Sequence, residues 1–222
     1  MPASRLTTSP IPMALYDVVG RDSPSSDEYV SHLGLTTEAL SQVAVDTSVP
    51  VTDMRPPLTE NQADWPIQTL GTVPLTSDQR EQGRVFLDEP LEEYVDQQVG
   101  GLRQYTIHPH VGRPTADCSY HRYSCVGLVI EADRNADVDL VVTDETQLPR
   151  VSLELLQQAY PDLAVSLERE GLRKKYGLMG DGPWPVVLAG YVLHSLARSG
   201  SDILNSPYQP QPGEERFPRR EH

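Results

Sequence analysis

The segment Ser124-Cys125-Val126-Gly127-Leu128-Val129-Ile130-Glu131-Ala132-Asp133-Arg134 predicts a helix with a cysteine in its first turn. Serine caps helices well because its side-chain oxygen accepts hydrogen bonds from the free amide groups at the helix start, so Ser124 is the expected cap. Val126, Val129 and Ile130 recur at helical spacing and give the helix one apolar face. Cys125 is therefore expected at the N-terminal end of a helix that packs on a core.

This position of Cys125 favours thiolate chemistry. Free amide donors and the positive end of the helix dipole can lower a cysteine pKa from ~8.5 to well below 7.5. A thiolate is a nucleophile, and the amide groups of Cys125 and Val126 could stabilise an oxyanion. The plainer interpretation is a small apolar residue in a core helix.

A nucleophilic cysteine needs a base, and the candidates are His32, His108, His110, His121 and His194. His32 lies in residues 28–35, which read as a strand whose alternate residues face one side. A strand can point a histidine rigidly at a helix N-terminus, which a loop does not guarantee. His32 is therefore the preferred base, and a strand histidine bonded to a neighbouring carbonyl is the alternative.

A third polar group should orient the imidazole. Residues 43–51 (VAVDTSVPV) alternate apolar and polar residues and predict the next strand. Asp46 in this strand is the best acidic candidate, with Gln42 and Glu38 as runners-up. The competing interpretation is that Asp46 faces solvent.

The middle of the chain mixes loops, strands and helices. Residues 52–66 hold three prolines and no period, which predicts a loop. Residues 70–74 could form a short strand. Thr76 or Ser77 is expected to cap a helix that ends near Pro90.

The C-terminal third is mainly helical in its pattern. Residues 138–142 (VDLVV) predict a strand, residues 151–176 a helical region broken by Pro161, and residues 184–198 an amphipathic helix. Residues from 205 onward are polar and proline-rich, which favours disorder. This order of elements indicates the α+β class. The expected organisation is a flexible segment 1–14, a main domain 15–150, a helical extension 151–204 packed on the same domain, and a disordered tail 205–222.

Four segments resemble, in order, the circularly permuted NlpC-like (YiiX-like) cysteine hydrolases, which are papain-like proteins whose histidine precedes the cysteine. His32-Leu33-Gly34-Leu35 resembles their H-V-G-I strand, and residues 43–51 resemble the next strand. Residues 73–94 resemble their L-T-x-x-Q-R helix. Residues 123–129 and 136–140 resemble the Y-x-C-S-x-L-V helix and the strand that follows it. The resemblance covers roughly residues 15–145.

The resemblance implies a permuted papain-like domain with a small antiparallel sheet, a nucleophile helix and a helical C-terminal extension. It implies a cysteine hydrolase, or an acyl transferase, acting on a peptide, amide or lipid-ester substrate without a cofactor. Cys125 would be the nucleophile, His32 the base and Asp46 the orienting acid. The chain departs from the family at Val126, where a polar residue is common, and in residues 99–116, which have no counterpart.

Two alternatives compete with the hydrolase. The first is a zinc module, because thiolate and imidazole suit zinc and five such residues lie close in sequence: His108, His110, Cys118, His121 and Cys125. No standard finger spacing fits this cluster. The second is a non-catalytic interaction protein with a degenerate papain-like fold, whose proline-rich segments would order on a protein partner.

Composition excludes some classes of function. The 222 residues include 32 acidic and 18 basic side chains, for a net charge of −14. Such a charge repels phosphate backbones and anionic membranes, so no nucleic-acid partner is expected. No apolar run approaches the ~20 residues that span a bilayer. The start of the chain does not resemble a secretory signal, so a cytoplasmic location is the expectation.

Overall fold

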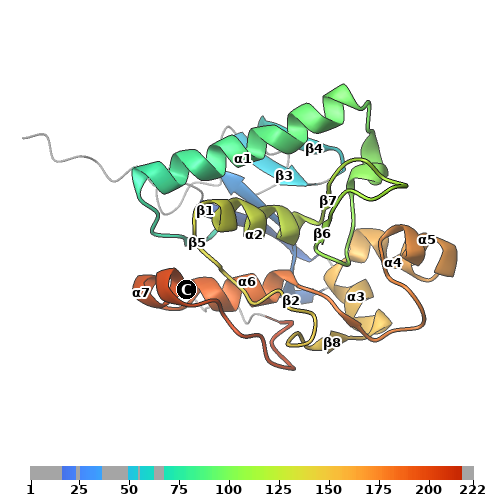
Figure 1. Ribbon diagram of the computed structural model, residues 1–222. Coiled ribbons are helices and arrows are strands. Elements are labelled where there is room, and N and C mark those ends of the chain that lie inside the picture. Colours follow the sequence, from blue (N-terminus) through green and yellow to red (C-terminus); the bar gives the residue numbers. More distant parts are fainter. Residues whose placement is uncertain (1–16, 24–25, 37–49, 55, 63–67, 217–222) are drawn as a thin grey trace, which may run out of the picture.

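A computed structural model describes residues 17–23, 26–36, 50–54, 56–62 and 68–216 (Figure 1). Within these residues an antiparallel five-stranded sheet has the order β4-β3-β2-β1-β5. Its strands are β1 (Asp17–Ser23), β2 (Ser26–Thr36), β3 (Pro50–Met54), β4 (Leu58–Gln62) and β5 (Gln68–Thr72). Helices pack on this sheet, so the α+β class and the small antiparallel sheet are confirmed.

The loop predicted over residues 52–66 is wrong. Residues 52–54 complete β3, and β4 pairs with it so that Asp53 lies opposite Thr59. Pro56 and Pro57, which suggested a loop, lie in the connection between these strands. Of the strand predicted over residues 43–51, only Pro50 and Val51 are described, and both belong to β3.

Helix α1 (Ser77–Asp96) begins as expected but ends later. Thr76 caps it, since the Gln79 amide donates to Thr76 Oγ1 at 3.3 Å and the Thr76 amide donates to Gln79 Oε1 at 3.0 Å. The predicted end near Pro90 is wrong. Pro90 is buried, and one turn later the Tyr94 hydroxyl donates to the His121 carbonyl at 3.0 Å. This packing outweighs the ~3 kcal/mol that an interior proline costs a helix.

Helix α2 (Cys125–Asn135) forms where the sequence predicts it. The Ser124 hydroxyl accepts from the Gly127 amide at 2.8 Å, which is the expected cap. The apolar face is fully buried, with Val126, Val129 and Ile130 at 0% exposure. The helix packs against β2 and β3 on one side and α1 on another, so it lies at the centre of the molecule (Figure 1).

A loop crosses the first turn of α2 at close range. A Cβ on Gly127 would lie 2.0 Å from the His110 carbonyl oxygen, a distance that no side chain tolerates. The same oxygen accepts from the Ser124 amide at 3.1 Å. The loop continues into a hairpin of β6 (Val111–Gly112) and β7 (Arg122–Tyr123). Only glycine at position 127 allows this loop to pack on the helix that carries Cys125.

The C-terminal third is a set of short helices with a small hairpin, β8 (Arg150–Val151) and β9 (Trp184–Pro185). Helices α3 and α6 both pack on β2, and α6 also contacts β5. None of the helices in the described ranges is long and apolar enough to cross a membrane. The helical elements are α3 (Leu153–Ala159), η2 (Pro161–Leu163), α4 (Ala164–Leu167), α5 (Glu170–Lys175), α6 (Ala189–Leu196) and α7 (Gly200–Asn205).

Two sequence predictions near the C-terminus differ from the structure. Residues 138–142 form no regular strand, and Val141 makes only a single bridge to Tyr208. The Tyr208 amide donates to the Leu140 carbonyl at 2.9 Å, and the Val142 amide donates to the Tyr208 carbonyl at 2.9 Å. Tyr208, which belongs to the expected disordered tail, therefore pairs with this segment, and Glu215 further along packs against Gly190 of α6.

Candidate active site

Strand β2 brings His32 beside an acid of β3. Gly34 pairs with Asp53, and His32 is two residues before Gly34, so both side-chain positions face the same side of the sheet. His32 and Asp53 are therefore diagonal neighbours across two antiparallel strands. This register directs both side chains to the face that α2 covers.

Gly34 makes room for this diagonal contact. A Cβ at position 34 would lie 2.7 Å from Val51 Cγ1 and 3.1 Å from Asp53 Cβ. Any larger residue would push into the space between His32 and Asp53. Gly34 is therefore needed in this segment so that strand β3 and Asp53 can approach closely.

The imidazole of His32 is held by a short bond to Asp53. The distance from His32 Nε2 to Asp53 Oδ2 is 2.6 Å, and the Thr59 hydroxyl donates to Asp53 Oδ1 at 3.0 Å. The side chains of His32 and Asp53 are 12% and 5% exposed. Asp53 thus has the orienting contact that the sequence assigned to Asp46, and Asp46 lies outside the described residues.

Cys125 lies on the other side of the same imidazole. Its thiol hydrogen-bonds the His32 ring and the backbone of Leu33 and Val126. Burial opposes ionisation of the thiol, but the contacts with His32 and these backbone groups outweigh it and lower the pKa of Cys125. The structure therefore brings together the predicted nucleophile, the predicted base and the predicted amide of Val126.

The imidazole is strongly stabilised in its charged form. Burial disfavours the charge, but the hydrogen bonds to Asp53 and Cys125 prevail and raise the pKa of His32 from 6.5 to about 9. Because Nε2 bonds Asp53, Nδ1 is the ring nitrogen left for the sulfur. The lowered thiol pKa and the raised imidazole pKa both favour the thiolate–imidazolium form of the pair over its neutral form.

Two tyrosines also approach the sulfur. Tyr105, which precedes the hairpin, hydrogen-bonds the Cys125 thiol through its hydroxyl. Tyr160, at the end of α3, is close enough to interact electrostatically with Cys125. Its hydroxyl is buried and has no hydrogen-bond partner among the described residues. Burial and the neighbouring thiolate raise the pKa of both phenols, so both remain neutral donors.

Cys125 itself is only 2% exposed. The buried side chains of Tyr105 and Tyr160 lie near it, and its thiol contacts the backbone of Leu33 in β2. A substrate carbonyl therefore reaches the sulfur only after residues around Cys125 move. The chemistry is assembled in a dry environment, which strengthens each of its electrostatic contacts.

The structure does not bring together the five residues of the zinc alternative. The part of the chain that the structure describes has no group of three or more histidine, cysteine or acidic side chains that could hold a metal. Cys125 faces His32, whereas the Cys118 thiol donates to the Tyr120 carbonyl at 3.4 Å. His121 bonds Glu93, and His108 and His110 approach Glu145 and Glu131. The five residues of the proposed cluster therefore point to different partners.

Sequence reasoning missed Asp53, Tyr105 and Tyr160. Asp53 had a signal, because it follows Val51 at the strand spacing of two and so shares a face with it. The prolines after it hid this signal by suggesting a loop. Tyr105 and Tyr160 had none, since each approaches Cys125 only through the tertiary packing of segments distant in sequence.

Comparison with protein-family models, with curated proteins and with solved structures found no match for this chain. The geometry of the Cys125 site is therefore the basis for any functional assignment.

Proposed function

We propose that this protein is a cysteine-dependent hydrolase, or an acyl transferase, that acts on an amide or ester bond. The observation that carries the proposal is a single imidazole, that of His32, shared between the Cys125 thiol and Asp53 at 2.6 Å. A nucleophile, a base within reach and a third group that orients the base are the parts that covalent acyl transfer needs.

In the proposed reaction the Cys125 thiolate attacks the substrate carbonyl carbon and forms a tetrahedral oxyanion. The Val126 amide at the start of α2 is one donor for this oxyanion, and the Tyr105 hydroxyl is a second. Collapse of the intermediate breaks the bond to the leaving group, which takes its proton from the His32 imidazolium. A thioester on Cys125 remains.

The second half of the reaction regenerates the thiol. His32, now neutral, accepts a proton from water, and the resulting nucleophile attacks the thioester carbonyl. The acid product leaves, and Cys125 returns to its thiolate paired with the imidazolium. An amine or alcohol in place of water would make the same site a transferase. Asp53 keeps the ring oriented throughout.

Tyr160 is proposed as a further donor to the bound acyl group. A buried hydroxyl without a hydrogen bond costs about 1–3 kcal/mol, so a phenol in this state near the nucleophile is best explained by a partner that arrives with the substrate. Tyr160 belongs to the helical region after residue 150. This region would then contribute to the site rather than only cover it.

The order of His32 before Cys125, the small antiparallel sheet and the helix that begins at the cysteine are all in keeping with a circularly permuted papain-like fold. We propose this fold family on these grounds. The substrate class that follows is a peptide, amide or lipid ester, and the site's own residues supply every acid, base and donor of the reaction.

The proposal is tested by the reactivity of Cys125 toward iodoacetamide at pH 6, followed by mass spectrometry. Cys118 in the same chain is a built-in reference, since it lacks the His32 contact. We expect Cys125 to react faster than Cys118 and faster than Cys125 of the urea-unfolded chain. His32→Ala should abolish this advantage, and His194→Gln, which changes a histidine beside Tyr208, should keep it.

A chemical readout complements labelling. p-Nitrophenyl acetate should release a burst of p-nitrophenol equal to one per chain, because the thioester forms faster than it hydrolyses. Cys125→Ser should remove the burst. Equal labelling of Cys125 in the folded, unfolded and His32→Ala proteins, together with no burst, would refute the hydrolase proposal.

A further inference from the structure

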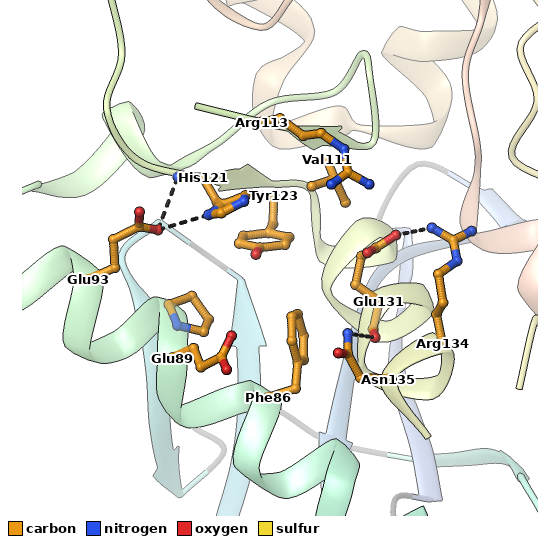
Figure 2. Close-up of a pocket in the computed structure, with 11 residues that line it drawn as sticks. Phe86, Glu89, Glu93, Val111, Arg113, His121, Tyr123, Glu131, Arg134 and Asn135 are labelled. Atoms are coloured by element: carbon orange, nitrogen blue, oxygen red, sulfur yellow. Dashed lines mark hydrogen bonds and ion pairs between the residues drawn. The ribbon is translucent and has the colours of Figure 1, made fainter. Parts of the chain in front are cut away.

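A polar cavity lies between α1, α2 and the β6–β7 hairpin (Figure 2). Its volume is about 520 Å³, which is in the range of pockets that hold small ligands. On α2, the first residue that lines the cavity is Glu131. At a rise of 1.5 Å per residue, Glu131 lies about 9 Å along the helix axis from Cys125. The cavity is therefore separate from the Cys125 site and independent of the function proposed for it.

Two aromatic rings line the middle of this cavity. Phe86 of α1 and Tyr123 of β7 meet edge to face, with ring centroids 6.2 Å apart and planes at 81°. Figure 2 shows both rings between the acidic side chains of α1 and those of α2. They form the apolar part of the cavity lining, although both side chains are largely buried, at 8% and 4% exposure.

Most charged groups of the walls are fixed by partners. The Glu93 carboxylate accepts from the His121 amide at 3.0 Å and lies 3.2 Å from His121 Nδ1. Arg134 pairs with Glu131, and it also donates to Asp139 at 3.0 Å. These bonds hold the wall side chains in place, because moving any one of them would break its hydrogen bond or ion pair.

Glu89 and Arg113 differ from the other wall charges. Among the residues that the structure describes, neither has a hydrogen bond or an ion pair. Figure 2 shows Glu89 on the α1 side and Arg113 on the hairpin side, with Phe86 and Tyr123 between them. Both residues line the cavity, and they shift the pKa of Tyr123 in opposite directions, Glu89 upward and Arg113 downward.

We propose that this cavity binds a short peptide with free ends, about two residues long. Its ammonium group would pair with Glu89, its carboxylate with Arg113, and its apolar part would lie on Phe86 and Tyr123. A simple cation would leave Arg113 unused and a simple anion would leave Glu89 unused. Two extended residues span about 7 Å, a length that a cavity of about 520 Å³ can hold.

Isothermal titration calorimetry with leucyl-leucine tests this site, in the Cys125→Ser background so that the peptide is not consumed. N-acetyl-leucyl-leucine lacks the ammonium group, and leucyl-leucine amide lacks the carboxylate. We expect each blocked peptide to bind about tenfold more weakly than the free dipeptide, since a charge-assisted contact of ~1.4 kcal/mol corresponds to that factor.

Variants locate the two contacts. Glu89→Gln should remove the preference for the free over the acetylated peptide, and Arg113→Gln should remove the preference for the carboxylate over the amide. Glu92→Gln, on the same helix but outside the cavity, and Arg169→Gln are the matched controls and should keep both preferences. The proposal is overturned if no heat is detected at millimolar peptide, if all three peptides bind equally, or if Glu89→Gln and Arg113→Gln bind like the controls.

Discussion

Cys125 and Asp133 lie on the same helix, and both are buried, at 2% and 1% exposure. Cys125 meets the His32 imidazole and two backbone groups of the chain, which lower its pKa. Both carboxylate oxygens of Asp133 are without a hydrogen-bond partner among the described residues, and burial alone raises its pKa to about 8. Burial opposes the charged form of both residues, and only Cys125 has partners that reverse this effect and lower its pKa.

The largest effect is expected from the partner of the imidazole. Asp53→Ala should lower the rate of Cys125 acylation by p-nitrophenyl acetate about 10³-fold, because His32 loses both orientation and the charge that favours imidazolium. Asp53→Asn should lose only about tenfold, since the amide oxygen still accepts from the ring, as in Cys-His-Asn sites. Burst kinetics measure both rates.

The control for this series is Asp88→Asn, an exposed residue of α1 whose carboxylate bonds Arg84 rather than a residue of the site, and it should match the parent. Equal rates for Asp53→Ala and the parent would mean that His32 needs no orienting acid. The Cys125 thiolate would then be stabilised by the N-terminal end of α2 rather than by its contact with the His32–Asp53 pair.

Asp133 should make stability depend on pH. Its pKa is about 8 in the folded chain and about 3.9 when unfolded, so only the unfolded state ionises freely between these values. The contribution to the free energy of unfolding is fully present below pH 3.9 and is lost as the pH rises toward 8. The loss should be on the order of several kcal/mol.

Urea denaturation of the parent and of Asp133→Asn at pH 5 and pH 8 measures this loss. The parent should lose more stability than the variant between the two values, and the difference between the proteins isolates Asp133 from other groups. A parallel decline in both proteins would show that Asp133 finds partners in solution and would remove the contrast with Cys125.

The pH profile of alkylation should report both members of the ion pair. Iodoacetamide should modify Cys125 well below the ordinary cysteine pKa of ~8.5, because His32 stabilises the thiolate. The rate should rise again as the pH passes about 9, where His32 loses its proton and the thiolate is freed from its partner. A single step near pH 8.5 would contradict the ion pair.

The smallest effect is expected at Tyr160. Tyr160→Phe should reduce the acylation rate about tenfold while leaving iodoacetamide labelling unchanged, because alkylation develops no oxyanion. Tyr191→Phe is the neighbouring control: Tyr191 acts on Tyr160 and its hydroxyl is also buried without a partner among the described residues, yet Cys125 is not among the charges that act on it. Equal effects of the two variants would make the Tyr160 hydroxyl structural.

Local signals explain which parts of the fold could be predicted. Ser124 and Thr76 cap their helices as expected, because a cap depends on a side chain and amide groups three residues apart. The strand of His32 and the helix of Cys125 follow from periodicity within one element. The nucleophile and the base could thus be chosen before their contact was known.

Tertiary structure decided the rest. Asp53 rather than Asp46 bonds His32 because the register of β2 and β3, with Gly34 opposite Asp53, puts that carboxylate in reach. Helix α1 continues through Pro90 because buried packing outweighs a local penalty. The amino-acid sequence by itself determined residue types and local periods. The hydrogen-bond partners of each buried group depend on strand register and on packing between distant segments, which no local pattern encodes. These partners in turn set the direction in which the pKa of the group shifts.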